Sequence, residues 1–287
     1  MSTTVYDDRA CDLGEGPLWH PGLGQLFWFD IIGKRLLTLD GDGPRQWQFD
    51  EYVSAAGWVD DATLLIASQS RLFRFGIETG ANETLVPLET DNPVTRSNDG
   101  RADPWGGFWI GTMGIEAEPD AGAIYRYFQG ELRKLHAPIS ISNAICFSPD
   151  RAFAYFTDTP TSLVMRQALA PDTGWPTAKA EVWLDLTAAG LAPDGAVTDA
   201  DGNVWIAHWG AGCVAAYRPD ATPLTQVDVP GLHATCPAFG GADFSTLYCT
   251  SARQGIAAPI LNQTPENGMT FCATGVALGR PEPQVIL

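Results

Sequence analysis

Short apolar runs that alternate with polar residues recur along the chain, and turns rich in Asp, Pro and Gly separate them. A period of two residues is typical of half-buried β-strands, whereas a helix would show a period of about 3.6 residues. Six segments share one order, in which an apolar strand, a turn and a second strand of aromatic and β-branched residues follow one another. These segments are residues 14–31, 54–75, 97–113, 142–159, 193–209 and 236–252.

The repeat has the length of a propeller blade. Aligning the second strands gives steps of 38, 44, 46, 50 and 43 residues between Phe27, Leu65, Trp109, Tyr155, Trp205 and Tyr248. A unit of this size holds a four-stranded blade, and a blade buries its faces only by stacking on neighbours in a closed ring. The pattern therefore predicts an all-β, six-bladed β-propeller, with residues 1–287 as a single domain and a strand near residues 4–9 completing the last blade. A β-sandwich or an irregular β-fold is the alternative.

The composition limits the partners rather than the reaction. The chain has 287 residues, a formal net charge of −17 and a sequence pI near 4.4. Such an acidic surface repels phosphate backbones and anionic lipids, so neither nucleic acid nor a membrane is an expected partner. No apolar stretch approaches the roughly 18 residues of a membrane span. We therefore expect a small-molecule ligand and a monomer or weak dimer.

Cysteine usage and the first residues bear on the compartment. Six cysteines, at positions 11, 146, 213, 236, 249 and 272, show no CxxC spacing, which argues against a zinc ribbon or a dithiol redox site. The opening MSTTVYDDRA lacks a basic region followed by an apolar run, so no secretory leader is expected. These features favour a cytoplasmic protein with reduced, mostly buried cysteines.

A polar residue occupies one position of the repeat in four of the six segments. Counting back 11 or 12 residues from the aligned positions reaches Glu15, Asn98, Asn143 and Asp194. In the sixth segment the count reaches Cys236, and in the second it reaches Val53 or Ser54. Equivalent positions of a propeller form one ring around its axis, so the four polar side chains are expected to converge on the central channel.

The converging side chains are two carboxylates and two carboxamides, which would repel one another or stay unsatisfied without a cation. An oxygen-rich set of this kind suits one divalent metal ion, namely Ca²⁺, Mg²⁺ or Mn²⁺, with Zn²⁺ or Fe²⁺ as alternatives. Arg96 would share a strand face with Asn98 and would bind a substrate oxygen or neutralise developing charge there, with a surface ion pair as the alternative. Taken singly, the polar residues also fit turns or strand ends, and for Asp99 we favour the turn.

Four segments resemble the signature motifs of the senescence-marker-protein (SMP-30)/gluconolactonase family, which includes regucalcin and bacterial sugar lactonases. They are LGEGPLWH, RSNDGRADPWGGFWIGTM, ISNAICFSPD and PDGAVTDADGNVWIAHWG. The likeness runs in a consistent order from about residue 11 to residue 252. It implies a six-bladed propeller with a single divalent metal.

The resemblance also implies a role for each matching residue. Three would bind the metal: Glu15, Asn143 and Asp194. Arg96 and Asn98 match positions that contact substrate hydroxyls, and Glu116 or Glu118 would add an acid on the substrate side. Ala144 departs from the family pattern, which usually has glycine after the Asn.

The function predicted is metal-dependent hydrolysis of a sugar-acid lactone, such as a glucono-, xylono-, arabinono- or galactonolactone, to the free acid. Asp194 is the candidate general base for the attacking water. The segment of residues 252–276 resembles bacterial pentonolactone and aldonolactone hydrolases, which places a lactonase ahead of the calcium-homeostasis role associated with regucalcin. Two alternatives remain: a metal-dependent phosphotriesterase or aryl-esterase, and a non-catalytic propeller that binds calcium or another ligand.

Overall fold

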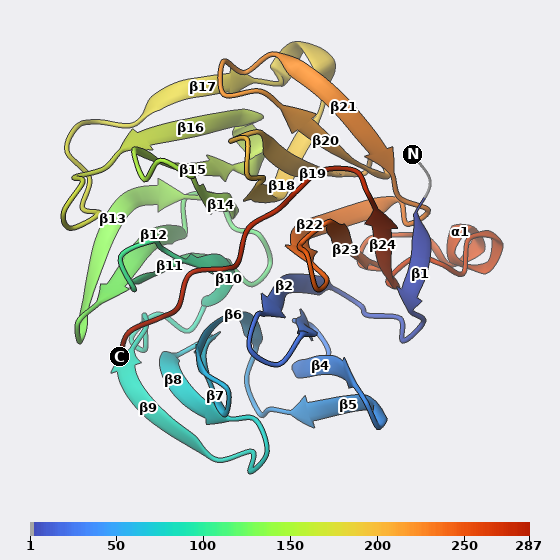
Figure 1. Cartoon of the computed structure of the whole chain (residues 1–287), viewed down its shortest axis with the longest axis horizontal. Helices are drawn as coiled ribbons and strands as arrows, with labels where there is room; N and C mark the ends of the chain where they lie inside the picture. Colours follow the sequence, from blue (N-terminus) through green and yellow to red (C-terminus); the bar gives the residue numbers. More distant parts are fainter. Residues whose placement is uncertain (1–2) are drawn as a thin grey trace.

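The computed structural model describes residues 3–287, and nearly all of its regular structure is β-sheet. Six four-stranded antiparallel sheets follow one another around a central axis, as the blades of a propeller do (Figure 1). The predicted all-β, six-bladed propeller is confirmed. Residues 1–2, the start of the segment in which no secretory leader was expected, lie outside the described residues.

Each blade runs from an innermost strand at the axis to an outermost strand at the rim. Blades 1 to 3 comprise β2 (Gly14–His20), β3 (Gln25–Asp30), β4 (Arg35–Asp40) and β5 (Gly43–Gln48); β6 (Val53–Asp60), β7 (Thr63–Ser68), β8 (Arg71–Gly76) and β9 (Asn82–Pro87); and β10 (Thr95–Ala102), β11 (Phe108–Gly114), β12 (Gly122–Phe128) and β13 (Glu131–Ile139). Each of the six sequence repeats therefore covers the two inner strands of one blade and the turn between them, and residues 54–75 extend into the third strand, β8.

Blades 4 to 6 follow the same plan, except that blade 6 borrows its outermost strand. They comprise β14 (Ser142–Phe147), β15 (Phe153–Asp158), β16 (Leu163–Ala168) and β17 (Glu181–Asp185); β18 (Ala192–Thr198), β19 (Val204–Trp209), β20 (Cys213–Tyr217) and β21 (Pro223–Asp228); and β22 (His233–Gly240), β23 (Thr246–Ala252), β24 (Thr270–Thr274) and β1 (Thr4–Asp7). The N-terminal strand β1 pairs with β24, so the predicted closure of the ring is confirmed.

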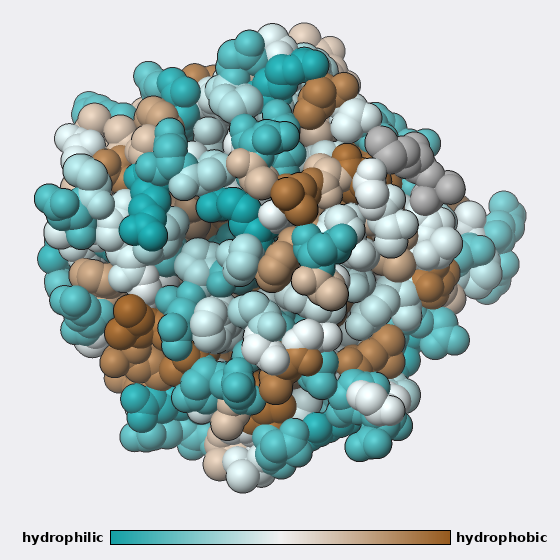
Figure 2. Space-filling model, viewed as in Figure 1, coloured by the Kyte–Doolittle hydropathy of each residue, from teal (hydrophilic) through white to brown (hydrophobic). Residues whose placement is uncertain are grey.

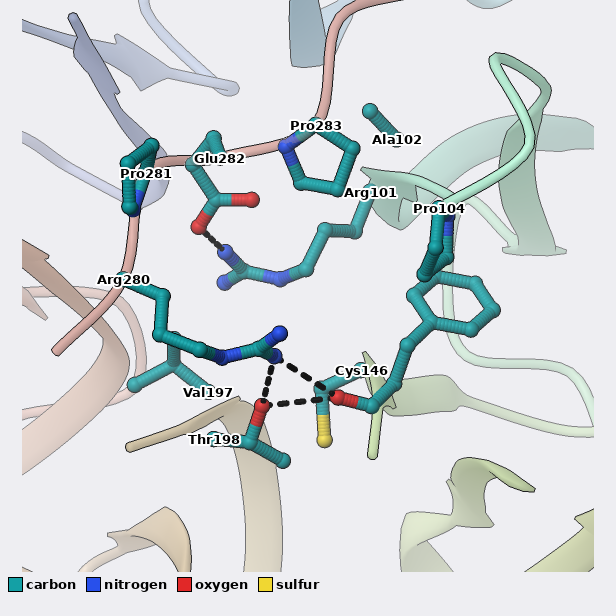
Figure 3. Close-up of a pocket in the computed structure, with 11 residues that line it drawn as sticks. Arg101, Ala102, Pro104, Cys146, Val197, Thr198, Arg280, Pro281, Glu282 and Pro283 are labelled. Atoms are coloured by element: carbon teal, nitrogen blue, oxygen red, sulfur yellow. Dashed lines mark hydrogen bonds and ion pairs between the residues drawn. The ribbon is translucent and has the colours of Figure 1, made fainter. Parts of the chain in front are cut away.

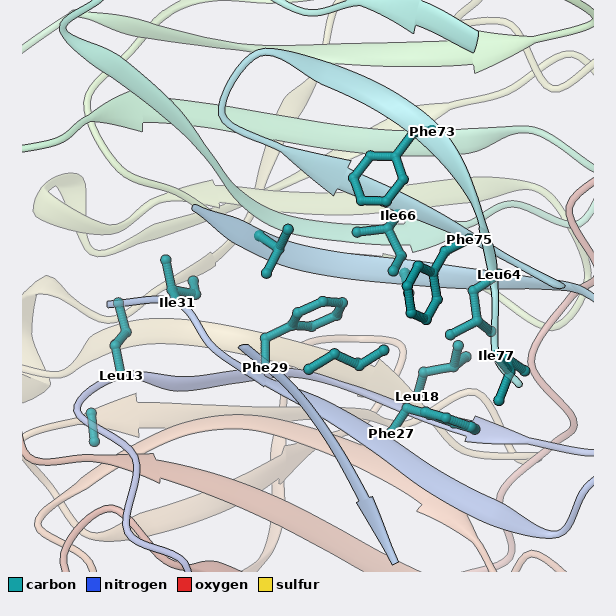
Figure 4. Close-up of a cluster of buried hydrophobic side chains, with 14 residues drawn as sticks. Leu13, Leu18, Phe27, Phe29, Ile31, Leu64, Ile66, Phe73, Phe75 and Ile77 are labelled. Atoms are coloured by element: carbon teal, nitrogen blue, oxygen red, sulfur yellow. The ribbon is translucent and has the colours of Figure 1, made fainter. Parts of the chain in front are cut away.

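The hydrophobic core consists of six clusters, one at each interface between neighbouring blades. In the cluster between blades 1 and 2, Phe27 and Phe29 of β3 face Ile66 of β7 and Phe75 of β8 (Figure 4). Burying both faces of every blade removes a large apolar area from water, which a single blade does not achieve. The core therefore holds the inner strands in a ring.

Every innermost strand contains a β-bulge near its start. In β14, for example, Asn143 pairs with Thr157 but the next paired residue is Cys146, opposite Tyr155, so the inner strand carries one extra residue. Corresponding shifts occur in β2, β6, β10, β18 and β22. A bulge turns the side chains beside it to a new direction, so the axis end of each blade can present polar groups.

Helices are few. The structure has one short α-helix, α1 (Ala258–Gln263), in the connection between β23 and β24, and two 3-10 turns, η1 (Thr159–Thr161) and η2 (Thr187–Ala189), within the described residues. Nothing among residues 3–287 forms a helix with the length and apolar character needed to cross a bilayer. All six cysteines are free thiols, five of them buried, as the sequence predicted.

Candidate functional site

A cavity of about 370 Å³ lies where the inner strands begin. All six residues predicted for the site line it: Glu15, Arg96, Asn98, Glu116, Asn143 and Asp194. They come from β2, β10, the turn after β11, β14 and β18, so blades 1, 3, 4 and 5 each contribute. The structure therefore brings together side chains that are up to 179 residues apart, the separation of Glu15 and Asp194.

Hydrogen bonds link the polar side chains of blades 3 and 4. One Arg96 guanidinium nitrogen donates to Asn98 Oδ1 (2.7 Å), and Asn98 Nδ2 donates to Asn143 Oδ1 (3.0 Å) and to the carbonyl of Ser142 (2.8 Å). Arginine can only donate, so Asn98 must turn its oxygen toward Arg96 and its nitrogen toward Asn143. This chain of bonds leaves Asn143 Oδ1 with a second lone pair at the cavity.

The series continues beyond Asn143 into blade 5. Asn143 Nδ2 donates to Thr159 Oγ1 (2.9 Å), and the Thr159 hydroxyl donates to the carbonyl oxygen of Pro193 (2.8 Å), next to Asp194. Thr159 belongs to η1, directly after β15, and it also lines the cavity. No motif in the sequence marks Thr159, and only its position after a second strand could have drawn attention to it.

Glu15 and Asp194 are buried carboxylic acids, each about 4% exposed. Within residues 3–287 neither forms an ion pair with a basic side chain. Burial, together with the nearby Asp99 carboxyl, raises the pKa of Glu15 to about 8. Burial and the neighbouring Glu15 raise the pKa of Asp194 well above its usual value. A bound cation would relieve the repulsion between two such desolvated acids.

The donor set fits one divalent metal ion. Glu15, Asn143 and Asp194 offer two carboxylates and one amide oxygen, the hard donors that Ca²⁺, Mg²⁺ and Mn²⁺ accept. No three His, Cys, Asp or Glu side chains gather as a metal-binding group in the part of the chain that the structure describes. A metal here would therefore need the amide oxygen of Asn143 beside the two acids, and the hydrogen bonds of Asn143 already direct that oxygen.

Arg96 is buried, at 5% exposure, so it does not form the surface ion pair that was its alternative. Its guanidinium donates to Asn98 Oδ1 and to the carbonyl of Ser97. Burial lowers the pKa of Arg96 to about 10, while the acids Glu15 and Asp194 oppose that shift. Arg96 therefore keeps its positive charge at neutral pH and supplies a donor at the cavity wall.

The turn predicted at Asp99 is wrong. Asp99 lies inside β10, is 2% exposed and accepts a hydrogen bond from the backbone of Ile145 (2.7 Å). Asn, Asp and Gly in succession favour a turn locally, but pairing of β10 with β11 absorbs them as a bulge. The side chain thus joins blade 3 to blade 4 below the site, and burial raises its pKa to about 6.

Of the two acids after β11, Glu116 is the one that lines the cavity. The Glu118 carboxylate instead accepts a hydrogen bond from the backbone nitrogen of Glu116 (3.0 Å). Glu118 therefore holds the turn, and Glu116 is exposed at the mouth of the cavity.

The remaining wall of the cavity is largely apolar, and the sequence did not single it out. It is formed by Leu13, Met113, Ile115, Ile141 and Trp209, with Gln254 and Gly255 from the segment before α1. The Trp209 ring stacks on His233 with 3.9 Å between ring centroids. These residues come from loops and strand ends outside the shared repeat position, so the alignment of repeats carries no signal for them.

Comparison with known proteins agrees with this architecture. The family described as "SMP-30/Gluconolactonase/LRE-like region" matches residues 13–253, and the chain belongs to it. A protein of Rhizobium meliloti (strain 1021) named "Putative sugar lactone lactonase" is 41% identical over 99% of this chain and 97% of its own length. The 6-deoxy-6-sulfogluconolactonase of Pseudomonas putida is 33% identical, covering 94% of each chain.

One solved structure of similar sequence matches almost the whole fold. It is the crystal structure of a calcium-binding protein, regucalcin, from Agrobacterium tumefaciens str. C58, which is 41% identical with a TM-score of 0.97. The match covers 100% of this chain and 99% of that one. The family that the sequence motifs resembled is therefore confirmed.

Proposed function

We propose that the protein is a metal-dependent lactonase that hydrolyses a sugar-acid lactone to the free acid. One observation carries the proposal: Glu15, Asn143 and Asp194 meet Arg96 and Asn98 in one cavity. Family membership and the lactonase names of the relatives support the reaction. The calcium-binding description of the similar crystal structure supports a divalent ion.

Glu15, Asn143 and Asp194 would hold the ion. When bound, a divalent ion would polarise the lactone carbonyl and stabilise negative charge that develops on its oxygen. Glu15 and Asp194 together bring two negative charges, which offset those of the ion and remove their mutual repulsion. Several ions share these donor types, so the ligands alone do not identify the ion. A metal titration of the protein would identify it.

The chain's own residues would orient the substrate and move the proton. Arg96 and Asn98 line one side of the cavity and offer donors and acceptors to sugar hydroxyls. Asp194 is the candidate to accept a proton from the attacking water, because its carboxylate lines the cavity in which the substrate would bind. Glu116, exposed at the mouth, would contact hydroxyls at the far end of the substrate.

The size and lining of the cavity favour a small ring. Ligand pockets commonly span roughly 300–1,000 Å³, and 370 Å³ lies at the lower end of that range. A pentono- or hexonolactone carries both hydroxyls and C–H groups around its ring. The cavity offers Arg96 and Asn98 to the hydroxyls, and Met113, Ile115 and Ile141 to the C–H groups.

The test measures acid release from glucono-, galactono-, xylono- and arabinonolactone after the protein has been stripped of metal. Ca²⁺, Mg²⁺, Mn²⁺, Zn²⁺ or Fe²⁺ is then added back singly, and the spontaneous ring opening is subtracted. We expect turnover that requires a metal and that Asp194→Asn and Glu15→Gln abolish. Absence of turnover with every lactone and every metal would contradict the proposal.

A further inference from the structure

The last ten residues cross the end of the channel opposite the cavity. We call residues 278–287 the C-terminal strap. Figure 1 shows it in red running over the centre of the ring from β24 toward blade 3, and Figure 2 shows side chains covering the centre of this face. The polar residues of the cavity lie near the starts of the inner strands β10, β14 and β18. The residues that form hydrogen bonds with the strap, Trp58, Phe147 and Thr198, lie near the ends of inner strands, so the strap is at the other end of the channel.

Backbone and side-chain contacts tie the strap to four blades in turn. Ala200 donates to the carbonyl of Leu278 (2.8 Å) and Gly279 donates to that of Phe244 (2.9 Å), in blades 5 and 6. Val285 donates to Trp58 and Ile286 to Gly106, each at 2.9 Å, in blades 2 and 3. These contacts fix the path of the strap, so the residues in its middle have defined positions over the channel.

Arg101 lies under the middle of the strap and holds three inner strands together. Its guanidinium donates to the carbonyl oxygens of Ile145 (3.2 Å), Ala196 (3.0 Å) and Pro237 (3.3 Å). Ile145 is two residues beyond Asn143, and Ala196 is two residues beyond Asp194. At about 3.3 Å per residue, the carbonyl groups that Arg101 binds lie about 7 Å along their strands from the two proposed metal ligands.

The Arg101 guanidinium also binds a fourth partner, which belongs to the strap. Its Nη1 donates to the Glu282 carboxylate, and both side chains are buried, at 9% and 6% exposure (Figure 3). Although burial alone would lower it, the pair with Glu282 raises the pKa of Arg101 above its ordinary value. A buried ion pair contributes little net stability, and its partners are held in a defined geometry.

We propose that Glu282 is a positioning residue for the metal site: by binding Arg101 it holds the guanidinium that clamps the strands carrying Asn143 and Asp194. This inference rests on the proposed function, because it takes the cavity to bind a divalent ion. The Glu282 carboxylate touches neither metal nor substrate and acts only through Arg101. Groups that orient metal-binding residues from outside commonly change metal affinity about 10–100-fold when they are removed.

The test compares Mn²⁺ affinity in full-length variants, by titration followed with electron paramagnetic resonance. Glu282→Gln removes the charge but keeps the shape, and we expect Mn²⁺ to bind about tenfold more weakly. Gln284→Ala is the matched control, since Gln284 also belongs to the strap but its side chain donates to the carbonyl of Val59, away from Arg101. This control should keep the wild-type affinity.

A second variant covers the case in which Glu282→Gln fails to fold. Arg101→Met combined with Glu282→Met replaces the ion pair by apolar side chains, so neither partner of the pair is left charged without the other. Circular dichroism and cooperative melting establish folding, and Mn²⁺ binding should again weaken about tenfold.

Wild-type Mn²⁺ affinity in a folded Glu282→Gln or double Met variant would overturn this inference alone, because the strap would then be only a structural brace. Failure of the wild-type protein to bind Mn²⁺ and, in the same titration, each of Ca²⁺, Mg²⁺, Zn²⁺ and Fe²⁺ would overturn the proposed metal site and the inference with it.

Discussion

Asn143 donates its side-chain amide to Thr159 Oγ1 at 2.9 Å, and Thr159 donates in turn to the carbonyl oxygen of Pro193. Because the Thr159 hydroxyl donates its only hydrogen to the carbonyl oxygen of Pro193, it can only accept a hydrogen bond from Asn143. The Asn143 amide therefore cannot rotate without losing this bond, and its oxygen stays directed toward Asn98 and the cavity. One side chain outside the repeat pattern thus fixes the orientation of a proposed metal ligand.

Replacing Thr159 by valine should weaken metal binding while leaving the fold intact. The change removes the acceptor for Asn143 Nδ2, so we expect about a tenfold loss of divalent-metal affinity and about 1 kcal/mol of stability. Thr161→Val is the control, because Thr161 lies in the same η1 turn but is exposed and donates to the Asp158 carbonyl. Titration calorimetry with both variants checks this, and equal affinities would contradict the orienting role.

Neutralising one buried acid should stabilise the metal-free protein and abolish its response to metal. Glu15→Gln removes a desolvated carboxyl beside Asp194, and we expect the metal-free melting temperature to stay constant or rise. The rise that saturating metal produces in the wild type should disappear, since only binding to the folded state stabilises it. Glu83→Gln, at an exposed position of β9, should retain that rise. A metal-induced shift in Glu15→Gln as large as that of the wild type would contradict the role of Glu15 as a ligand.

Acid should destabilise the protein through His136. Its ring stacks on Phe156 with centroids 4.3 Å apart, and burial lowers its pKa from 6.5 to about 4. The folded pKa lies below the unfolded value, so the unfolded chain binds the proton first as the pH falls. The contribution to stability is therefore complete above about pH 6.5 and decreases toward pH 4, by of the order of 3 kcal/mol in total.

The measurement is urea unfolding of the wild type and His136→Phe at pH 7.5 and pH 4.5. Phenylalanine keeps the stacking on Phe156 but cannot take up a proton, so the variant should lose about 2–3 kcal/mol less stability between the two pH values. Equal losses in both proteins would show that His136 is not the titrating group.

Gly195→Ala should disturb the site through packing alone. A Cβ at Gly195 would approach Cys236 of blade 6 far inside contact distance, at both its sulfur and its Cβ. Because the backbone of β22 cannot yield as a flexible side chain would, we expect a loss of about 2–3 kcal/mol and displacement of the adjacent Asp194. Gly41→Ala has open space around it and should change stability by less than about 0.5 kcal/mol. Thermal unfolding compares the two, and a wild-type melting temperature for Gly195→Ala would contradict the tight contact.

The sequence by itself determined the propeller and most of the predicted site. Strand periodicity is local, and blades of one length can bury their faces only in a ring, so six repeats specify the fold. Equivalent repeat positions then lie around one axis, which is why the repeat alone predicts that Glu15, Asn98, Asn143 and Asp194 converge. Arg96 followed from its spacing to Asn98 on one strand.

Only the tertiary structure decided which other residues meet these four. Asp99 reads as a turn because its local sequence favours one, yet pairing with β11 keeps it inside a strand. Thr159 reaches Asn143 from the end of a second strand, and Glu282 reaches Arg101 across 181 positions of the chain. Such contacts depend on where closure of the ring places the loops between strands and the C-terminal strap. A periodic pattern indicates which face of a strand is buried, but it does not indicate which distant side chain lies against that face.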